Sequence, residues 1–72
     1  MTLDHLSIGT KSVIAGVAGP STALIKARAI GLRVGRQVEI IARSGRLILA
    51  MVGHSRIALT LDLARHIEVR ES

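Results

Sequence analysis

Residues 37–59 read QVEIIARSGRLILAMVGHSRIAL, and this stretch decides the fold class of the chain. Apolar residues alternate over 37–43, residues 46–52 are apolar on both faces, and a further alternating run covers 56–59. Short breaks containing glycine separate the three runs, as they do between antiparallel strands. The stretch therefore predicts three consecutive strands, and the second is expected to be central because both of its faces are apolar.

The segment before residue 37 predicts a strand and a helix. Leu3 and Leu6 indicate one packed turn, and residues 11–18 alternate as a strand that ends at a Gly-Pro pair, since proline donates no backbone hydrogen bond. Residues 23–30 hold good helix formers and no glycine or proline. Gly31 stands where a left-handed residue would end that helix, with a hydrophobic contact from the next residue.

The segment after residue 59 adds a short helical turn and a last strand. Thr60 is a suitable cap for a turn over 61–65, and alternation over 67–70 indicates a strand. We expect a mainly β fold: a small barrel of about five strands with one short α-helix and one short helical turn. The 72 residues are expected to form one domain, 1–72.

The composition narrows the range of partners. Ten Lys and Arg residues against five Asp and Glu give a net charge of +5, which favours nucleic acid, an anionic membrane surface or an acidic protein face. No aromatic residue is present to stack on bases, so nucleic acid is not expected to be the partner. No apolar stretch approaches the ~20 residues of a membrane helix, and the start does not read as a signal peptide. A cytoplasmic protein without direct membrane insertion is expected.

Catalysis has no motif to support it. The chain has no cysteine, and it shows neither a nucleophile elbow nor a glycine loop that cradles phosphate. We therefore expect no enzyme and no cofactor. Weak binding of a divalent metal such as zinc or iron is one alternative, with His5, His66 and Glu68 as ligands. His66 and Glu68 are two residues apart and would share one face of the last strand. Exposed polar residues without a metal are the simpler interpretation.

The helix over 23–30 and its exit combine apolar and basic residues. Leu24 and Ala27 fall on one helical stripe, which is expected to face the core, whereas Ile25 lies about 100° away and is expected to be partly exposed. An apolar spot with a basic rim is typical of a docking surface. The predicted partner-binding residues are Leu24, Ile25, Arg28, Leu32 and Arg33. An ordinary core helix with a charged outer face is the alternative.

Six segments, in order, complete the sequence pattern. They are residues 1–9 (MTLDHLSIG), 11–17 (KSVIAGV), 24–32 (LIKARAIGL), 34–40 (VGRQVEI), 53–59 (GHSRIAL) and 64–69 (ARHIEV). Their order and spacing resemble the FeoA family, the small cytoplasmic component of bacterial ferrous iron uptake. Two departures occur: Val34 stands where the family usually has proline, and the hairpin at Ser44-Gly45 is short.

The resemblance implies an SH3-like barrel that binds or modulates FeoB, the membrane permease with a GTP-binding domain. It implies no catalytic residues, and any membrane association would come through the permease. Two alternatives stay open: a regulatory barrel that binds nucleic acid or a transcription-regulator partner, since iron-dependent repressors carry a similar domain, and a metal-bridged homo-oligomer.

Overall fold

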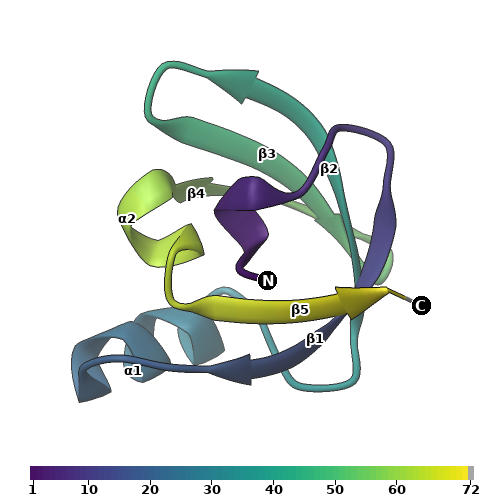
Figure 1. Cartoon of the computed structure of the whole chain (residues 1–72). Helices are drawn as coiled ribbons and strands as arrows, with labels where there is room; N and C mark the ends of the chain where they lie inside the picture. Colours follow the sequence, from purple (N-terminus) through teal and green to yellow (C-terminus); the bar gives the residue numbers. More distant parts are fainter. Residues whose placement is uncertain (72) are drawn as a thin grey trace.

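The computed structural model describes residues 1–71, which form one five-stranded sheet flanked by short helices (Figure 1). The elements are the 3-10 helix η1 (Leu3–His5), β1 (Lys11–Val17), α1 (Ser21–Ala29), β2 (Gln37–Ser44), β3 (Leu47–Val52), β4 (Ser55–Thr60), α2 (Leu61–Ala64) and β5 (Ile67–Glu71). The strand order is β4-β3-β2-β1-β5, and all neighbouring strands are antiparallel. The predicted mainly β fold with five strands is confirmed.

Residues 37–59 form the meander that their pattern predicts. Two-residue turns join β2 to β3 and β3 to β4, with Ser44 opposite Leu47 and Val52 opposite Ser55. Along β3, Ile48, Ala50 and Val52 are buried, and the alternate residues Leu49 and Met51 are half-buried. One face of this interior strand is therefore buried, and the other is only partly covered, since Leu47 on that face is 51% exposed. The expected covering of both faces is met only in part.

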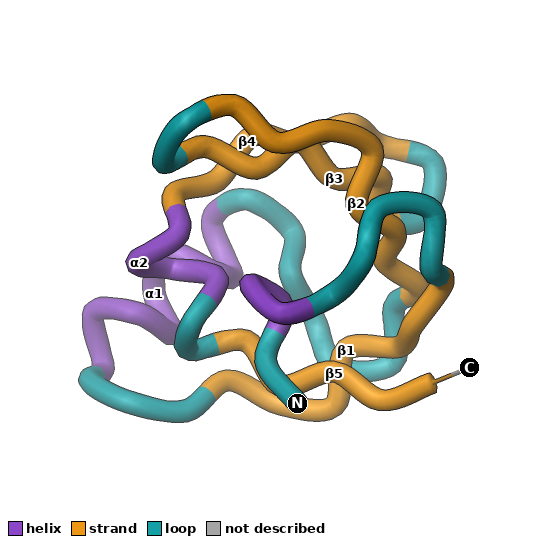
Figure 2. Tube along the Cα trace, turned by 45° about the horizontal axis from the view of Figure 1, so that its top comes forward, coloured by secondary structure: helices purple, strands orange, loops and turns teal. Residues whose placement is uncertain are grey.

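The sheet curls strongly, as expected for a small, partly open barrel, and it does not close. β4 and β5 are the two ends of the strand order and do not pair with each other. In Figure 2 the helices occupy the side of the ring between these strands. The outer edge of β5 is covered by the N-terminal residues, since Val69 N–H donates to Met1 O at 2.8 Å and Thr2 forms a bridge with Glu68.

Two β-bulges shift which residues face the core. Ala15 is the extra residue in β1 and Ile41 is the extra residue in β2, where the pairing register changes. In β1, Ile14 is buried and Val17 also packs against the core, although three positions separate them. The expected regular alternation over 11–18 and 37–43 is therefore broken once in each strand.

The core is aliphatic and draws residues from every element. It comprises Leu3, Leu6, Ile14, Ala27, Leu32, Val38, Ile40, Ile48, Ala50, Val52, Leu59, Ala64, Ile67 and Val69. The predicted N-terminal turn is confirmed as η1, and Arg43 holds it in place by donating from Nη2 to Asp4 O at 2.9 Å and Leu6 O at 2.6 Å. Thr60 caps α2, as predicted, by accepting from Leu63 N–H at 3.2 Å.

Candidate partner-binding surface

The end of α1 determines which of the predicted surface residues are accessible. Leu32 N–H donates to Ala27 O at 2.9 Å and Gly31 N–H donates to Arg28 O at 3.2 Å, which is the Schellman pattern of hydrogen bonds. Gly31 has φ +90°, the left-handed conformation that this motif uses. The motif turns Leu32 inward, where it is 1% exposed. Including Leu32 among the partner-binding residues was therefore wrong, because its side chain belongs to the core.

The outer side of α1 carries the remaining apolar candidates. Ala23 and Ala27, one helical turn apart, are the buried residues of the helix. Ile25 lies about 180° from the midpoint between them at 100° per residue, and it is 66% exposed. Leu24 was expected on the buried stripe but is 38% exposed, because the helix turns its alanines toward the core. The partial exposure expected for Ile25 is confirmed.

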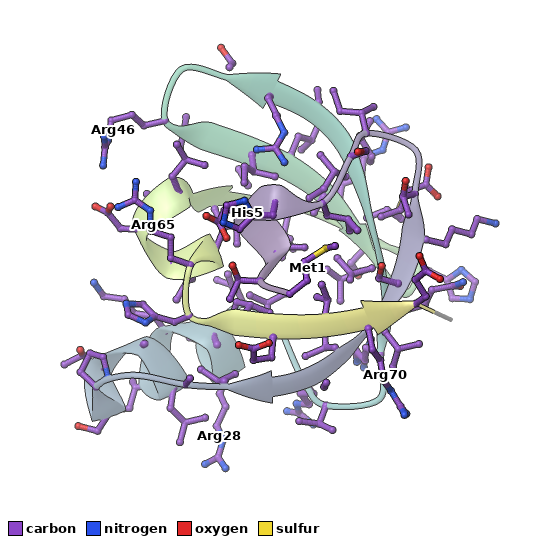
Figure 3. The ribbon with its side chains drawn as sticks, viewed as in Figure 1. Met1, His5, Arg28, Arg46, Arg65 and Arg70 are labelled. Carbon is purple, nitrogen blue, oxygen red and sulfur yellow. The ribbon has the colours of Figure 1, made fainter. Side chains whose placement is uncertain are left out.

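The basic candidates lie on and just beyond this helix. Arg28 is one turn after Leu24 and projects away from the body of the molecule below α1 (Figure 3). Arg33 is exposed in the loop that follows the helix, next to Val34, which is 67% exposed. Within residues 1–71 neither arginine forms an ion pair, since the paired carboxylates belong to Asp4, Asp62 and Glu68. The positive charge of this region is thus uncompensated by the chain itself.

The structure also forms a groove that sequence reasoning missed. One wall is the side of α1 that carries Lys26, and the other is β4 around Ala58, with α2 at one end. Its lining is Pro20, Thr22, Ala23, Lys26, Ala29, Ile30, Ala58, Leu59, Thr60, Asp62, Leu63 and His66. No local pattern could have revealed it, because the two walls are about thirty residues apart in the chain and meet only through the curl of the sheet.

The predicted metal ligands are not brought together within the molecule. His5 is exposed on η1 with Nε2 3.5 Å from Asp4 Oδ2, and Glu68 Oε2 lies 3.4 Å from the N-terminal nitrogen. His66 lies in the turn before β5 instead of on the strand, lines the groove, and accepts a hydrogen bond at its backbone oxygen from Ala18 N–H at 2.8 Å. In the described part of the chain no three His, Asp or Glu side chains are grouped for a metal ion.

His66 instead packs against the loop before α1. Gly19 in this loop has φ +94°, and a β-carbon built on it would lie 2.8 Å from His66 Cε1 and 3.2 Å from Cγ. The imidazole ring therefore occupies the space that a side chain at this position would need. The contact fixes the start of α1 against the turn between α2 and β5.

None of the helices within residues 1–71 is long and apolar enough to cross a bilayer.

Comparison with known proteins places the chain in a family. The sequence model of the FeoA domain matches residues 1–71. A crystal structure of an iron uptake regulatory protein, FeoA, is similar at TM-score 0.86 and 28% identity, over 96% of this chain and 92% of that one. FeoA of Stenotrophomonas maltophilia, an SH3 domain protein complexed with zinc, matches at TM-score 0.82 and 28% identity, over 97% and 89%. No curated protein sequence matches the chain.

Longer proteins contain the same fold. Iron(II) transport protein A of Clostridium thermocellum matches at TM-score 0.90 and 26% identity, and this chain covers 45% of its length. A manganese-dependent transcriptional repressor matches at TM-score 0.91 over 100% of this chain and 41% of the repressor. Its identity is 17%, so that likeness extends to the fold alone. The SH3-like fold, open between β4 and β5 in this chain, is therefore shared by free-standing proteins and by parts of larger ones.

Proposed function

Because the chain belongs to the FeoA family, which is linked to ferrous iron transport, we propose that it is a non-enzymatic accessory protein of bacterial ferrous iron uptake. It acts in the cytoplasm by docking onto the FeoB-type permease or its GTP-binding domain. The outer side of α1 and the loop after it form the docking surface.

The observation that carries this proposal is the exposure of Ile25 on the outer side of α1. Ile25 is 66% exposed, so covering its large aliphatic side chain with a partner would stabilise the complex by about 25 cal/mol per Å² of apolar area buried. Arg28 lies three residues after Ile25 on the same helix and Arg33 lies in the loop that follows, and neither forms an ion pair within residues 1–71. An apolar centre with an uncompensated basic rim fits an acidic protein face, and interfaces of this kind depend on a few central anchors.

Two pairs of matched variants test the docking surface. In a pull-down with the permease, Ile25→Ser is expected to weaken capture by about tenfold or more, as for a central anchor residue. Leu47→Ser is its control, since Leu47 is 51% exposed at the start of β3 and away from α1. Arg28→Glu is expected to weaken capture, and Arg70→Glu, which makes the same charge change on β5, is not.

Equal capture of Ile25→Ser and Leu47→Ser by the permease would exclude α1 as the docking surface. Loss of capture in both control variants would show that general charge or surface hydrophobicity is responsible. In either case the assignment of residues fails, while capture of the wild-type chain still tests the partner itself.

A regulatory barrel is the second candidate, and the repressor with the same fold supports it. The net charge of +5 would supply the salt-dependent attraction that nucleic acids exert on basic proteins. A salt-dependent gel shift with DNA or RNA at protein concentrations that capture no permease would favour this candidate. The absence of aromatic residues argues for the permease instead.

A metal-bridged homo-oligomer is a separate proposal, and the zinc complex of the Stenotrophomonas maltophilia relative motivates it. His5, His66 and Glu68 lie apart in one molecule, so a bridging ion would need ligands from two copies. Analytical size exclusion with zinc and with EDTA tests it, and identical elution in both would count against a bridge.

A further inference from the structure

One edge of the sheet is covered by the N-terminal residues, and the other edge is open. The outer edge of β5 is occupied by Met1 and Thr2, whereas no strand formed by residues 1–71 lies on the outer side of β4, at the other end of the strand order. An open strand edge presents a row of unpaired backbone N–H and C=O groups, which is a template for another strand. The β4 edge is therefore the place in this fold where an extended segment can add.

The register identifies which groups of β4 face outward. Val52 and Ser55 flank a two-residue turn, so they form a hydrogen-bonded pair, and bonded pairs then alternate along the hairpin. Leu61 N–H continues this alternation by donating to Arg46 O at 2.9 Å. Arg56 and Ala58 are the intervening residues, so their backbone N–H and C=O groups point away from β3. Among the described residues no backbone hydrogen bond outside the β3–β4 ladder involves either residue.

The groove between α1 and β4 lies next to this edge. Ala58 and Thr60 border it, and its floor is formed by aliphatic side chains such as Ile30, Leu59 and Leu63. Successive side chains of a strand alternate between faces. A strand added beside β4 would thus place every second side chain against the apolar floor and the others on the exposed face.

The charged residues at and beside the groove indicate that the added segment is acidic. Lys26 on the α1 wall and Arg56 on β4 are exposed, and neither forms an ion pair within residues 1–71. Asp62 is the acidic residue of the lining, and its carboxylate is held by Arg46 at 2.9 Å and by Arg65 at 3.5 Å. Lys26 in the lining of the groove and Arg56 on the adjoining strand β4 are thus cations without an ion pair, while the carboxylate of the lining is already paired.

We propose that the β4 edge binds an extended acidic segment of a partner protein by strand addition, with apolar side chains of that segment in the groove and carboxylates near Arg56 and Lys26. A second copy of this chain fits less well. It carries the same +5 charge, and pairing two β4 edges would bring two Arg56 residues onto one new ladder. The surface is separate from the outer side of α1, so this inference stands or falls independently of the permease.

A labelled peptide of alternating glutamate and valine is the probe, used with the full chain in fluorescence anisotropy. Saturable binding that weakens with added salt is expected. The same peptide with N-methyl groups on the amides of one edge keeps its side chains but cannot form the ladder, and it is expected to bind about tenfold or more weakly. A peptide in which lysine replaces glutamate is expected not to bind.

Variants of the chain locate the binding. Arg56→Glu is expected to weaken the glutamate peptide several-fold, whereas Arg70→Glu, a matched charge reversal on β5, leaves it unchanged. Ala58→Pro removes one outward N–H without removing a bond to β3, so it is expected to weaken binding while the chain stays folded by circular dichroism. In NMR spectra of the wild-type chain, the amide signals of Arg56 and Ala58 are expected to shift and to gain exchange protection.

Three results would overturn the proposal. One is equal binding of the N-methylated peptide, which would mean that side-chain charge alone is recognised. Another is a set of shifted amides on the outer side of α1 with Arg56 and Ala58 unchanged. The third is a concentration-dependent dimer that Ala58→Pro abolishes, since a second copy would then occupy the edge.

Discussion

Replacing Gly19 by alanine tests the contact that anchors the start of α1 to the turn before β5. The backbone there has φ +94°, and an L-residue held at positive φ costs about 1–2 kcal/mol. The new methyl group would also meet the His66 ring, 2.8 Å from Cε1 and 3.2 Å from Cγ. Moving the ring off its rotamer adds roughly 0.5–1.5 kcal/mol. A loss of roughly 2–3 kcal/mol in the free energy of unfolding is expected, a large part of the stability of so small a domain.

Gly9→Ala is the matched control. Gly9 has φ +87°, and a β-carbon there meets no atom within 4 Å, so only the backbone cost of about 1–2 kcal/mol applies. The gain from restricting the unfolded chain is common to both glycine replacements and cancels in the comparison. The difference between the two variants therefore isolates the ring contact.

Urea unfolding followed by far-UV circular dichroism is the assay, because the chain has no aromatic residue to give a fluorescence signal. His66→Ala combined with Gly19→Ala completes a double-mutant cycle, and removing the ring should reduce the cost of the alanine to that of Gly9→Ala. Equal losses for Gly19→Ala and Gly9→Ala, or no rescue by His66→Ala, would refute the reasoning.

Three further substitutions are predicted to change unfolding free energy in different ways, measured by the same urea titration. Thr60→Ala removes the hydroxyl that accepts from Leu63 N–H and should lower the free energy of unfolding by about 1 kcal/mol, whereas Thr60→Ser keeps a hydroxyl and should lose much less. Equal stability of the wild-type chain and both Thr60 variants would exclude the cap. Ile48→Ala empties a fully buried core position and should cost about 2–5 kcal/mol, and a loss below that of Thr60→Ala would contradict the packing. Ser12→Ala should instead raise stability by roughly 1 kcal/mol, because the Ser12 hydroxyl is buried without a hydrogen-bond partner; a loss of stability would show that the hydroxyl is satisfied.

Much of the fold is predictable from local chemistry. The meander over residues 37–59, the cap at Thr60 and the helix end at Gly31 and Leu32 each follow from short-range rules on alternation, capping and left-handed glycine. The Schellman end also explains why Leu32 was misassigned. The same motif that predicts the helix end also predicts a hydrophobic contact from Leu32, and this contact buries it.

The orientation of α1 could not be predicted because apolar residues occur all round the helix. Leu24 and Ala27 make as good a stripe as Ala23 and Ala27, and only packing against the rest of the protein decides between them. The groove beside β4 depends on packing in the same way. The placement of His66 depends on packing too: it lies in a turn that the strand pattern did not distinguish from β5, so His66 and Glu68 do not share a strand face as expected.

The bulges at Ala15 and Ile41 make the shape of this protein depend on residue count as much as on residue type. Most substitutions at these two positions leave the direction of later side chains unchanged. Deleting Ala15 or Ile41 would restore simple alternation from Ile14 to Val17 and from Ile40 to Arg43, and it would remove the bend and extra twist that each bulge gives its strand. Homologues are therefore expected to vary in identity at the two bulges and to preserve the spacing around them.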